Sequence, residues 1–145
     1  MPPTRIPTTI AVGFDGSPDA VRALAWAAGL AATTGARLVV IHAVGLLEHA
    51  GIAGRSTAHR EAVLGTAAGA GLGPERVEWS VADGDPCSVL LRATEGPDPA
   101  DLLVVGSRGA GGHPGSVLGS TSLELAERVR TPLVIVPEGH PVTVP

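Results

Sequence analysis

The hydrophobic residues of this chain gather in five short apolar runs. The second run, RLVVIHAV, shows no polar alternation, which is typical of a strand covered on both faces in a parallel sheet. The third, RVEWSVA, alternates apolar and polar residues, so we expect a strand with one exposed face. The predicted strands are 8–14, 37–44, 76–82, 101–105 and 133–136.

Between these runs the sequence predicts helices. The first begins after Ser17, a good N-cap residue, with Pro18 at the first helical position and Asp19 favourable for the helix dipole. Asp85-Pro86 gives the same start signal further along the chain. The predicted helices are 18–34, 56–70, 86–95 and 116–130.

Strands and helices alternate along the chain, and both the first and the last of the predicted elements are strands. Such alternation is typical of α/β proteins in which helices cover both faces of an open parallel sheet. Ligands of these sheets bind at the carboxyl ends of the strands, where the strand order reverses. A length of 145 residues suits a single domain, 1–145, with a loose arm at 1–7 and a proline-rich tail at 138–145. The alternation alone leaves the strand order open.

Composition narrows the classes of function. The net charge is −4 and the arginines are scattered, so we expect no nucleic-acid partner. No apolar stretch approaches the roughly 20 residues of a membrane span, and the amino-terminal residues lack the apolar region of a signal peptide. The single cysteine, Cys87, fits a reducing compartment. We therefore expect a cytoplasmic protein without a membrane partner.

The most informative stretch runs from Asp101 to Ser122. An apolar run is followed there by Gly106, Gly109 and Gly119, and then by the hydroxyls of a predicted helix start. Glycine lets the backbone approach a ligand closely, and successive N–H groups in a loop or at a helix N-terminus bind anions. The order of strand, glycine-rich loop and helix start therefore predicts a phosphate site.

Two common phosphate loops do not fit this stretch. A Walker A loop needs a lysine, and the chain has none. The dinucleotide fingerprint Gly-x-Gly-x-x-Gly fails because Pro114 stands at the third glycine position when the motif starts at Gly109. A glycine-rich connection without any ligand remains the simplest alternative.

The glycine spacing resembles the ATP-binding signature of the universal stress protein family, Gly-x2-Gly-x9-Gly-Ser/Thr. The resemblance extends over nearly the whole chain, through VGFDGS at 12–17, the strand 38–44 with its His42, Gly84-Asp85-Pro86, and TPLVIV at 131–136. It implies a Rossmann-like sheet, of the adenine nucleotide alpha hydrolase-like kind, with strand order 3-2-1-4-5. The order would reverse between strands one and four, which would bring Asp15 beside the glycine loop.

The same resemblance implies an adenine nucleotide site. Asp15 would lie near the ribose and phosphates and reach a Mg²⁺ ion through water. Ala43 would offer its backbone to the adenine edge, and Val12 and Gly13 would line the base pocket. The remaining contacts, to ribose and phosphates, would come from Gly106, Arg108, Gly109, Gly119, Ser120 and Thr121.

Several of these residues have a purely structural alternative. Asp15 is also a common turn former. His42, inside an apolar strand, is expected to be a hydrogen-bonded structural histidine rather than a ligand. Cys87 lies near a helix start that can lower a thiol pKa, but a small buried residue is the favoured interpretation. His113-Pro114 departs from the family pattern, and proline removes one N–H donor, which puts nucleotide affinity in doubt.

The function expected from these features is that of a cytoplasmic, ATP-binding universal stress protein that acts as a nucleotide-dependent sensor or adaptor for a protein partner still to be identified. We expect no enzyme, or at most slow ATP hydrolysis, because no candidate base has a supporting partner and no lysine is present to stabilise transferred charge. The histidines show no metal-binding spacing. The alternative is a dimeric interaction module of the same fold that binds no nucleotide. In either case the resemblance implies a homodimer through the fifth strand.

Overall fold

The computed structural model describes residues 6–44, 52–108 and 118–139. The predicted arm at 1–7 and tail at 138–145 therefore fall largely outside the described residues. Five strands, β1 (Thr9–Gly13), β2 (Arg37–Val44), β3 (Val77–Asp83), β4 (Leu102–Gly106) and β5 (Leu133–Val136), form one sheet of order β3-β2-β1-β4-β5. All four strand pairs are parallel. The implied strand order 3-2-1-4-5 is confirmed.

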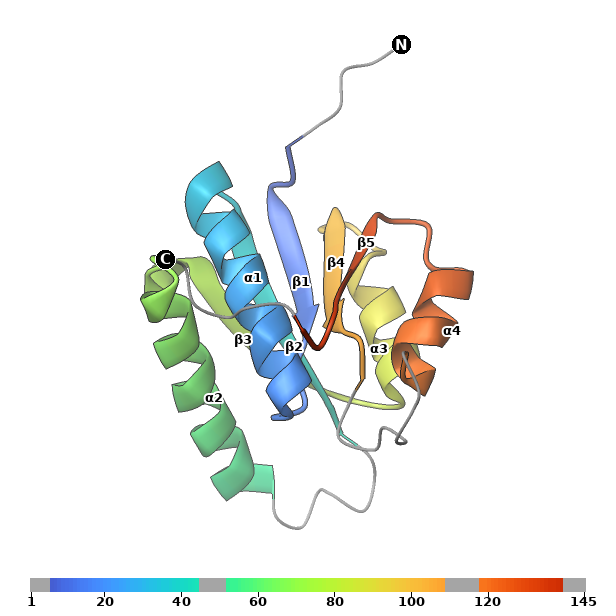
Figure 1. The fold of residues 1–145 in the computed structure, drawn as a ribbon, viewed down its shortest axis with the longest axis horizontal. Coiled ribbons are helices and arrows are strands. Elements are labelled where there is room, and N and C mark those ends of the chain that lie inside the picture. The colour runs from blue at the N-terminus through green and yellow to red at the C-terminus, as the bar shows by residue number, and fades with distance from the viewer. Residues whose placement is uncertain (1–5, 45–51, 109–117, 140–145) are drawn as a thin grey trace.

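Helices cover both faces of this sheet (Figure 1). The helices α1 (Pro18–Thr34) and α2 (Ile52–Gly69) lie on one face, and α3 (Pro86–Ala93) and α4 (Ser120–Arg128) lie on the other. A short 3₁₀ helix, η2 (Pro74–Arg76), precedes β3. No helix among the described residues is both long enough and apolar enough to cross a membrane.

The start and end of α1 follow from local chemistry. The Ser17 hydroxyl accepts a hydrogen bond from the Ala20 N–H at 3.2 Å, as expected for an N-cap. Gly35 ends the helix with φ of 81°, and its N–H donates to the Ala31 carbonyl. The buried face of α1 is mostly alanine, which lets the helix lie close to the sheet; it comprises Ala20, Ala23, Leu24, Ala27, Ala28 and Ala31.

The sheet separates two hydrophobic layers. Along β2, Leu38 and Val40 belong to the core shared with α1 and α2, and Ile41 belongs to the core shared with α3 and α4. On β3, Trp79 packs against the first of these cores while Glu78 is exposed. Val81, on the same face as Trp79, is 37% exposed, and Ala82, on the face of Glu78, packs against the second core. Exposed residues thus lie on both faces of β3, and the prediction of one exposed face was wrong.

Four predicted helix boundaries were wrong, including the end of the last helix, which lies at Arg128 rather than at 130. The helix α2 begins at Ile52, so Ser56 lies inside it, and α3 ends at Ala93 because Thr94 leaves the helical conformation with ψ of 2°. The start predicted at 116 for the last helix lies outside the described residues, but Gly119 is extended, with φ of −79° and ψ of 170°. The helix α4 therefore begins only at Ser120.

Candidate functional site

The strand order reverses between β1 and β4, which pair side by side in the middle of the sheet. From β1 the chain turns into α1 on one face, and from β4 it leads to α4 on the other (Figure 1). The carboxyl ends of these strands, Gly13 and Gly106, therefore mark the place where a ligand of such a sheet binds. The described residues among the predicted site residues fall in two places. They lie in or just beyond β1, β2 and β4, or at the start of α4.

Asp15 forms the turn that follows β1. Its Oδ1 accepts a hydrogen bond from the Ser17 N–H at 2.9 Å, and Gly16 adopts the left-handed conformation with φ of 83°. Asp15 therefore does form a turn, as its structural interpretation predicted. The residue is also exposed, and it follows β1 at the carboxyl edge of the sheet.

A cluster of rings supports this turn from the side of α2. His42 on β2 donates from Nδ1 to the Phe14 carbonyl oxygen at 2.8 Å and stacks on Trp79 with ring planes 14° apart. His42 is therefore hydrogen-bonded, as its structural interpretation predicted. The ring of His59 lies 5.0 Å from that of His42, measured between centroids, and borders Gly16. Sequence reasoning missed this use of His59, because the contact depends on how α2 lies across the turn.

The ends of the glycine loop are joined at its base. The Ser107 carbonyl oxygen accepts the Gly119 N–H at 2.6 Å and the Ser122 hydroxyl at 2.9 Å. Both serines are buried. The chain between them includes Gly109, His113 and Pro114, and these three lie outside the described residues. The pairing of Ser107 with Ser122 carries no sequence signal beyond the hydroxyls themselves, and the sequence analysis did not identify it.

The start of α4 differs from the starts of α1 and α3. Ser17 caps α1, and the Asp85 carboxylate caps α3 by accepting the Ser88 N–H at 3.0 Å, a bond that lowers the pKa of Asp85. Gly119 at the N-cap of α4 has no side chain and makes no such bond. The first turn of α4 therefore presents N–H groups and the positive end of the helix dipole without a carboxylate or hydroxyl from its own N-cap, which suits an anion.

The side chains around this helix start are polar. Ser120 is exposed and Thr121 is half-buried, so both hydroxyls lie at the surface of the first turn. Arg108 follows the end of β4, and its guanidinium forms an ion pair with Glu138, which lies beyond β5. A cation and two hydroxyls thus accompany the N-terminus of α4.

Gly106 has a structural reason to be glycine. A Cβ at this position would lie 2.8 Å from the carbonyl oxygen of Asp19 and 2.9 Å from its carbonyl carbon. The first turn of α1 therefore presses directly against the end of β4. This contact requires glycine whether or not a ribose or phosphate approaches, which the sequence analysis did not foresee.

The expectation for Val12 needs correction, and the favoured one for Cys87 holds. Val12 is 0% exposed in the core, so its side chain does not line a surface open to a base, whereas Gly13 and Ala43 are half-buried at the edge of the sheet. Cys87, in the first turn of α3, is buried in the core, and this burial raises the pKa of its thiol, with Glu124 adding to the effect. The favoured interpretation as a small buried residue is confirmed.

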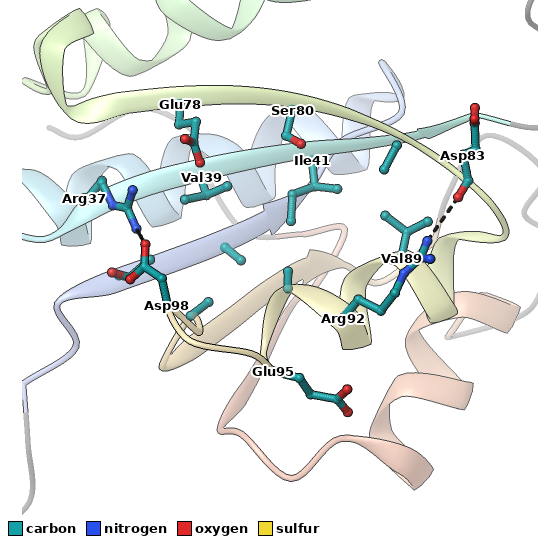
Figure 2. A pocket seen from close by; sticks show the side chains of 15 residues that line it. Arg37, Val39, Ile41, Glu78, Ser80, Asp83, Val89, Arg92, Glu95 and Asp98 are labelled. Atoms are coloured by element: carbon teal, nitrogen blue, oxygen red, sulfur yellow. Dashed lines mark hydrogen bonds and ion pairs between the residues drawn. The ribbon is translucent and has the colours of Figure 1, made fainter.

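A separate groove of about 580 Å³ runs along the α3 face of β2 and β3 (Figure 2). Arg37 and Asp98 form a 2.8 Å ion pair at one end, and Arg92 donates to the Asp83 carbonyl at the other. In the described part of the chain, no helix crosses β3 on this face, because α3 leads from β3 towards β4. The groove thus follows from the topology, and its wall on β3 is polar, with Glu78 and Ser80. Among the described residues, no three His, Cys, Asp or Glu side chains gather as metal ligands would.

Fold and site together define an α/β protein with an open parallel sheet, an order reversal at β1 and β4, and beside it a helix start without a side-chain cap. The chain belongs to the universal stress protein family, whose model matches residues 7–137. A universal stress protein of Thermus aquaticus is 33% identical over 134 residues, which covers 88% of this chain and 97% of that protein.

Other relatives are longer. A universal stress protein of Mycobacterium tuberculosis is 33% identical over 137 residues, which is 90% of this chain but 48% of that protein. The chain thus spans about half the length of this relative. A universal stress protein solved in complex with cAMP matches with a TM-score of 0.73 and 32% identity, covering 91% of this chain and 98% of that one. One from Archaeoglobus fulgidus, solved with dAMP, shares the fold with a TM-score of 0.68 and 20% identity over 91% of this chain and 99% of that one.

Proposed function

We propose that this chain is a cytoplasmic universal stress protein that binds ATP, together with Mg²⁺, at the carboxyl edge of β1 and β4. The observation that carries the proposal is the start of α4, where Gly119 provides no side-chain cap and Ser120 and Thr121 add hydroxyl donors. The related structures solved with cAMP and dAMP support an adenine nucleotide as the ligand.

The donor set fits a nucleotide phosphate chain. In this proposal the first-turn N–H groups of α4 and the hydroxyls of Ser120 and Thr121 donate to phosphate oxygens. Arg108 adds positive charge when it exchanges its partner Glu138 for a phosphate. Gly106 and Gly109 leave room for the ribose and phosphates, and Gly109 lies outside the described residues. A bound Mg²⁺ would neutralise part of the phosphate charge.

The remaining groups of the proposed site lie along the neighbouring strands. Asp15 is exposed at the carboxyl edge and would hold Mg²⁺ through water. Gly13 and the backbone of Ala43 are placed at the same edge for the base. The protein would act as a sensor or adaptor, in which binding orders the glycine loop and changes a surface that a protein partner recognises. We propose no enzymatic role beyond slow hydrolysis.

We expect Gly119→Val to weaken ATP binding by at least about tenfold, because a branched side chain at the N-cap would occupy the space in front of the α4 N–H groups. The measurement is calorimetric titration with ATP and Mg²⁺, preceded by chromatography of the nucleotides released from the denatured wild-type protein. AMP and cAMP are titrated in parallel to establish which adenine nucleotide binds most tightly.

The matched control is Gly29→Val in the middle of α1, where a Cβ meets nothing within 4 Å. This variant should bind ATP as the wild type does. If the wild type binds no adenine nucleotide, or if both valine variants bind equally well, the nucleotide proposal fails, and the dimeric interaction module becomes the better account.

We also propose a homodimer formed through β5. This strand lies at the edge of the sheet, and its apolar residues Leu133, Val134 and Ile135 remain partly exposed. Edge strands with apolar side chains favour pairing with another chain. Sedimentation equilibrium should give twice the mass of the chain, and a monomer at micromolar concentration would remove the dimer from both proposals.

A further inference from the structure

We infer that Asp19 is a positioning residue that holds the entry of the glycine loop in the geometry needed for nucleotide binding. This inference rests on the proposed function, since it concerns the same site. Sequence reasoning assigned Asp19 only a favourable interaction with the dipole of α1 and placed Asp15 beside the loop instead. The structure assigns the contact with the described part of the loop to Asp19.

The side chain of Asp19 bridges α1 and the residues that follow β4. Its Oδ2 accepts a hydrogen bond from the backbone N–H of Arg108 at 3.2 Å, and its Oδ1 accepts one from the Arg22 guanidinium at 2.7 Å. The carboxylate is 12% exposed, so it is well shielded from water. Arg22 balances its charge, which leaves the second oxygen to fix the direction of the Arg108 peptide.

The main chain of Asp19 reinforces this link. The close approach of its carbonyl group to Gly106 fixes the distance between α1 and the end of β4. Residues 106–108 are therefore held on one side by α1, through Gly106 and Arg108. On the other side they are held by α4, because the Ser107 carbonyl binds Gly119 and Ser122.

The arrangement has a mechanical consequence. Asp19 accepts the N–H of the peptide unit between Ser107 and Arg108, and the carbonyl oxygen of the same unit carries the hydrogen bonds that orient the first turn of α4. The Ser107 N–H is fixed separately, because it donates to the Val136 carbonyl on β5. Without the carboxylate, this peptide unit loses its partner on the α1 side, and the N–H groups of α4 lose part of their fixed direction relative to β1. Phosphate binding would then include the cost of ordering this peptide unit again.

A simple electrostatic role predicts the opposite result. A carboxylate close to a phosphate site repels the ligand, so its removal would strengthen ATP binding if repulsion dominated. The pairing of Asp19 with Arg22 argues against this, because the arginine offsets the negative charge. The direction of the change in ATP affinity therefore separates positioning from repulsion.

The experiment compares Asp19→Ala with Asp19→Asn, both in an Arg22→Ala background. Asparagine has one side-chain oxygen, and without Arg22 that oxygen is available to the Arg108 N–H, whereas alanine offers no acceptor. Two quantities are measured: hydrogen exchange of the Arg108 amide in nucleotide-free protein by NMR, and the dissociation constant for ATP with Mg²⁺ by calorimetry. Urea unfolding checks that the variants have equal stability.

We expect the alanine variant to exchange the Arg108 amide about five- to tenfold faster and to bind ATP about tenfold more weakly than the asparagine variant, the effect of one lost hydrogen bond. Both variants lack the carboxylate charge, so a change in repulsion affects them equally. Equal ATP binding by the two variants, or tighter binding by the alanine variant, would overturn the inference. If neither the wild type nor the Arg22→Ala parent binds ATP, the proposed function itself fails, which is a distinct result.

Discussion

Replacing Gly106 with alanine is expected to lower the free energy of unfolding by about 2–3 kcal/mol, the upper part of the usual range for overpacking. The added methyl group would lie 2.8–2.9 Å from main-chain atoms of Asp19. A backbone cannot move aside as a side chain does, so either α1 shifts away from β4 or the end of β4 bends. Urea unfolding followed by circular dichroism measures the loss.

Gly13→Ala is the matched control for this substitution. A Cβ at Gly13 also meets an atom at 2.9 Å, but that atom is the Cδ1 methyl of Leu90, at the end of a flexible side chain. Leu90 can change its rotamer, so we expect a loss of about 1 kcal/mol or less. A loss at Gly106 no larger than at Gly13 would show that α1 is not pressed against β4 as described.

Replacing Gly16 with alanine should lower the free energy of unfolding by about 2–3 kcal/mol, for two separable reasons. Gly16 has φ of 83°, a conformation that costs an L-residue about 1–2 kcal/mol. The new methyl group would also lie 2.8 Å from Nε2 of His59 and push that ring away from His42. The same urea experiment measures the total.

Gly35→Ala isolates the first of these reasons. Gly35 has nearly the same φ of 81°, and a Cβ there meets nothing within 4 Å. It should therefore cost only the conformational part, about 1 kcal/mol. In a His59→Ala background, Gly16→Ala should lower the free energy of unfolding by no more than Gly35→Ala does. Equal costs at the two glycines in the wild-type background would show that His59 does not confine the turn.

The elements of this fold were predictable because their signals are local. Ser17-Pro18-Asp19 and Asp85-Pro86 start α1 and α3 as expected, since a cap needs only the neighbouring N–H groups. The start of α4 was missed because Gly119 is held extended by the carbonyl of Ser107, a residue on the far side of the glycine loop. The strand order came from the family resemblance, since alternation alone does not determine it.

The candidate site was predictable in position but only partly in its residues. The glycine spacing led to the end of β4 and the start of α4, which the structure places at the order reversal. The contact from Asp19 on α1 was not foreseen, because it depends on how closely the first turn of α1 lies on β4. The direction of the Cys87 pKa shift likewise depends on burial by neighbouring elements, which a helix-start pattern does not reveal.

The hydrogen bonds that join Ser107 to Gly119 and Ser122 also separate the folding of the sheet from the length of the glycine loop. They close the loop at its base, so the sheet and α4 keep their geometry whatever number of residues lies between. Doubling the length of such a closed loop adds only about 0.6 kcal/mol of closure entropy. Folding therefore sets little constraint on the number of residues in the glycine loop, so the fixed spacing of Gly106, Gly109 and Gly119 in the family signature points to a requirement other than the stability of the sheet.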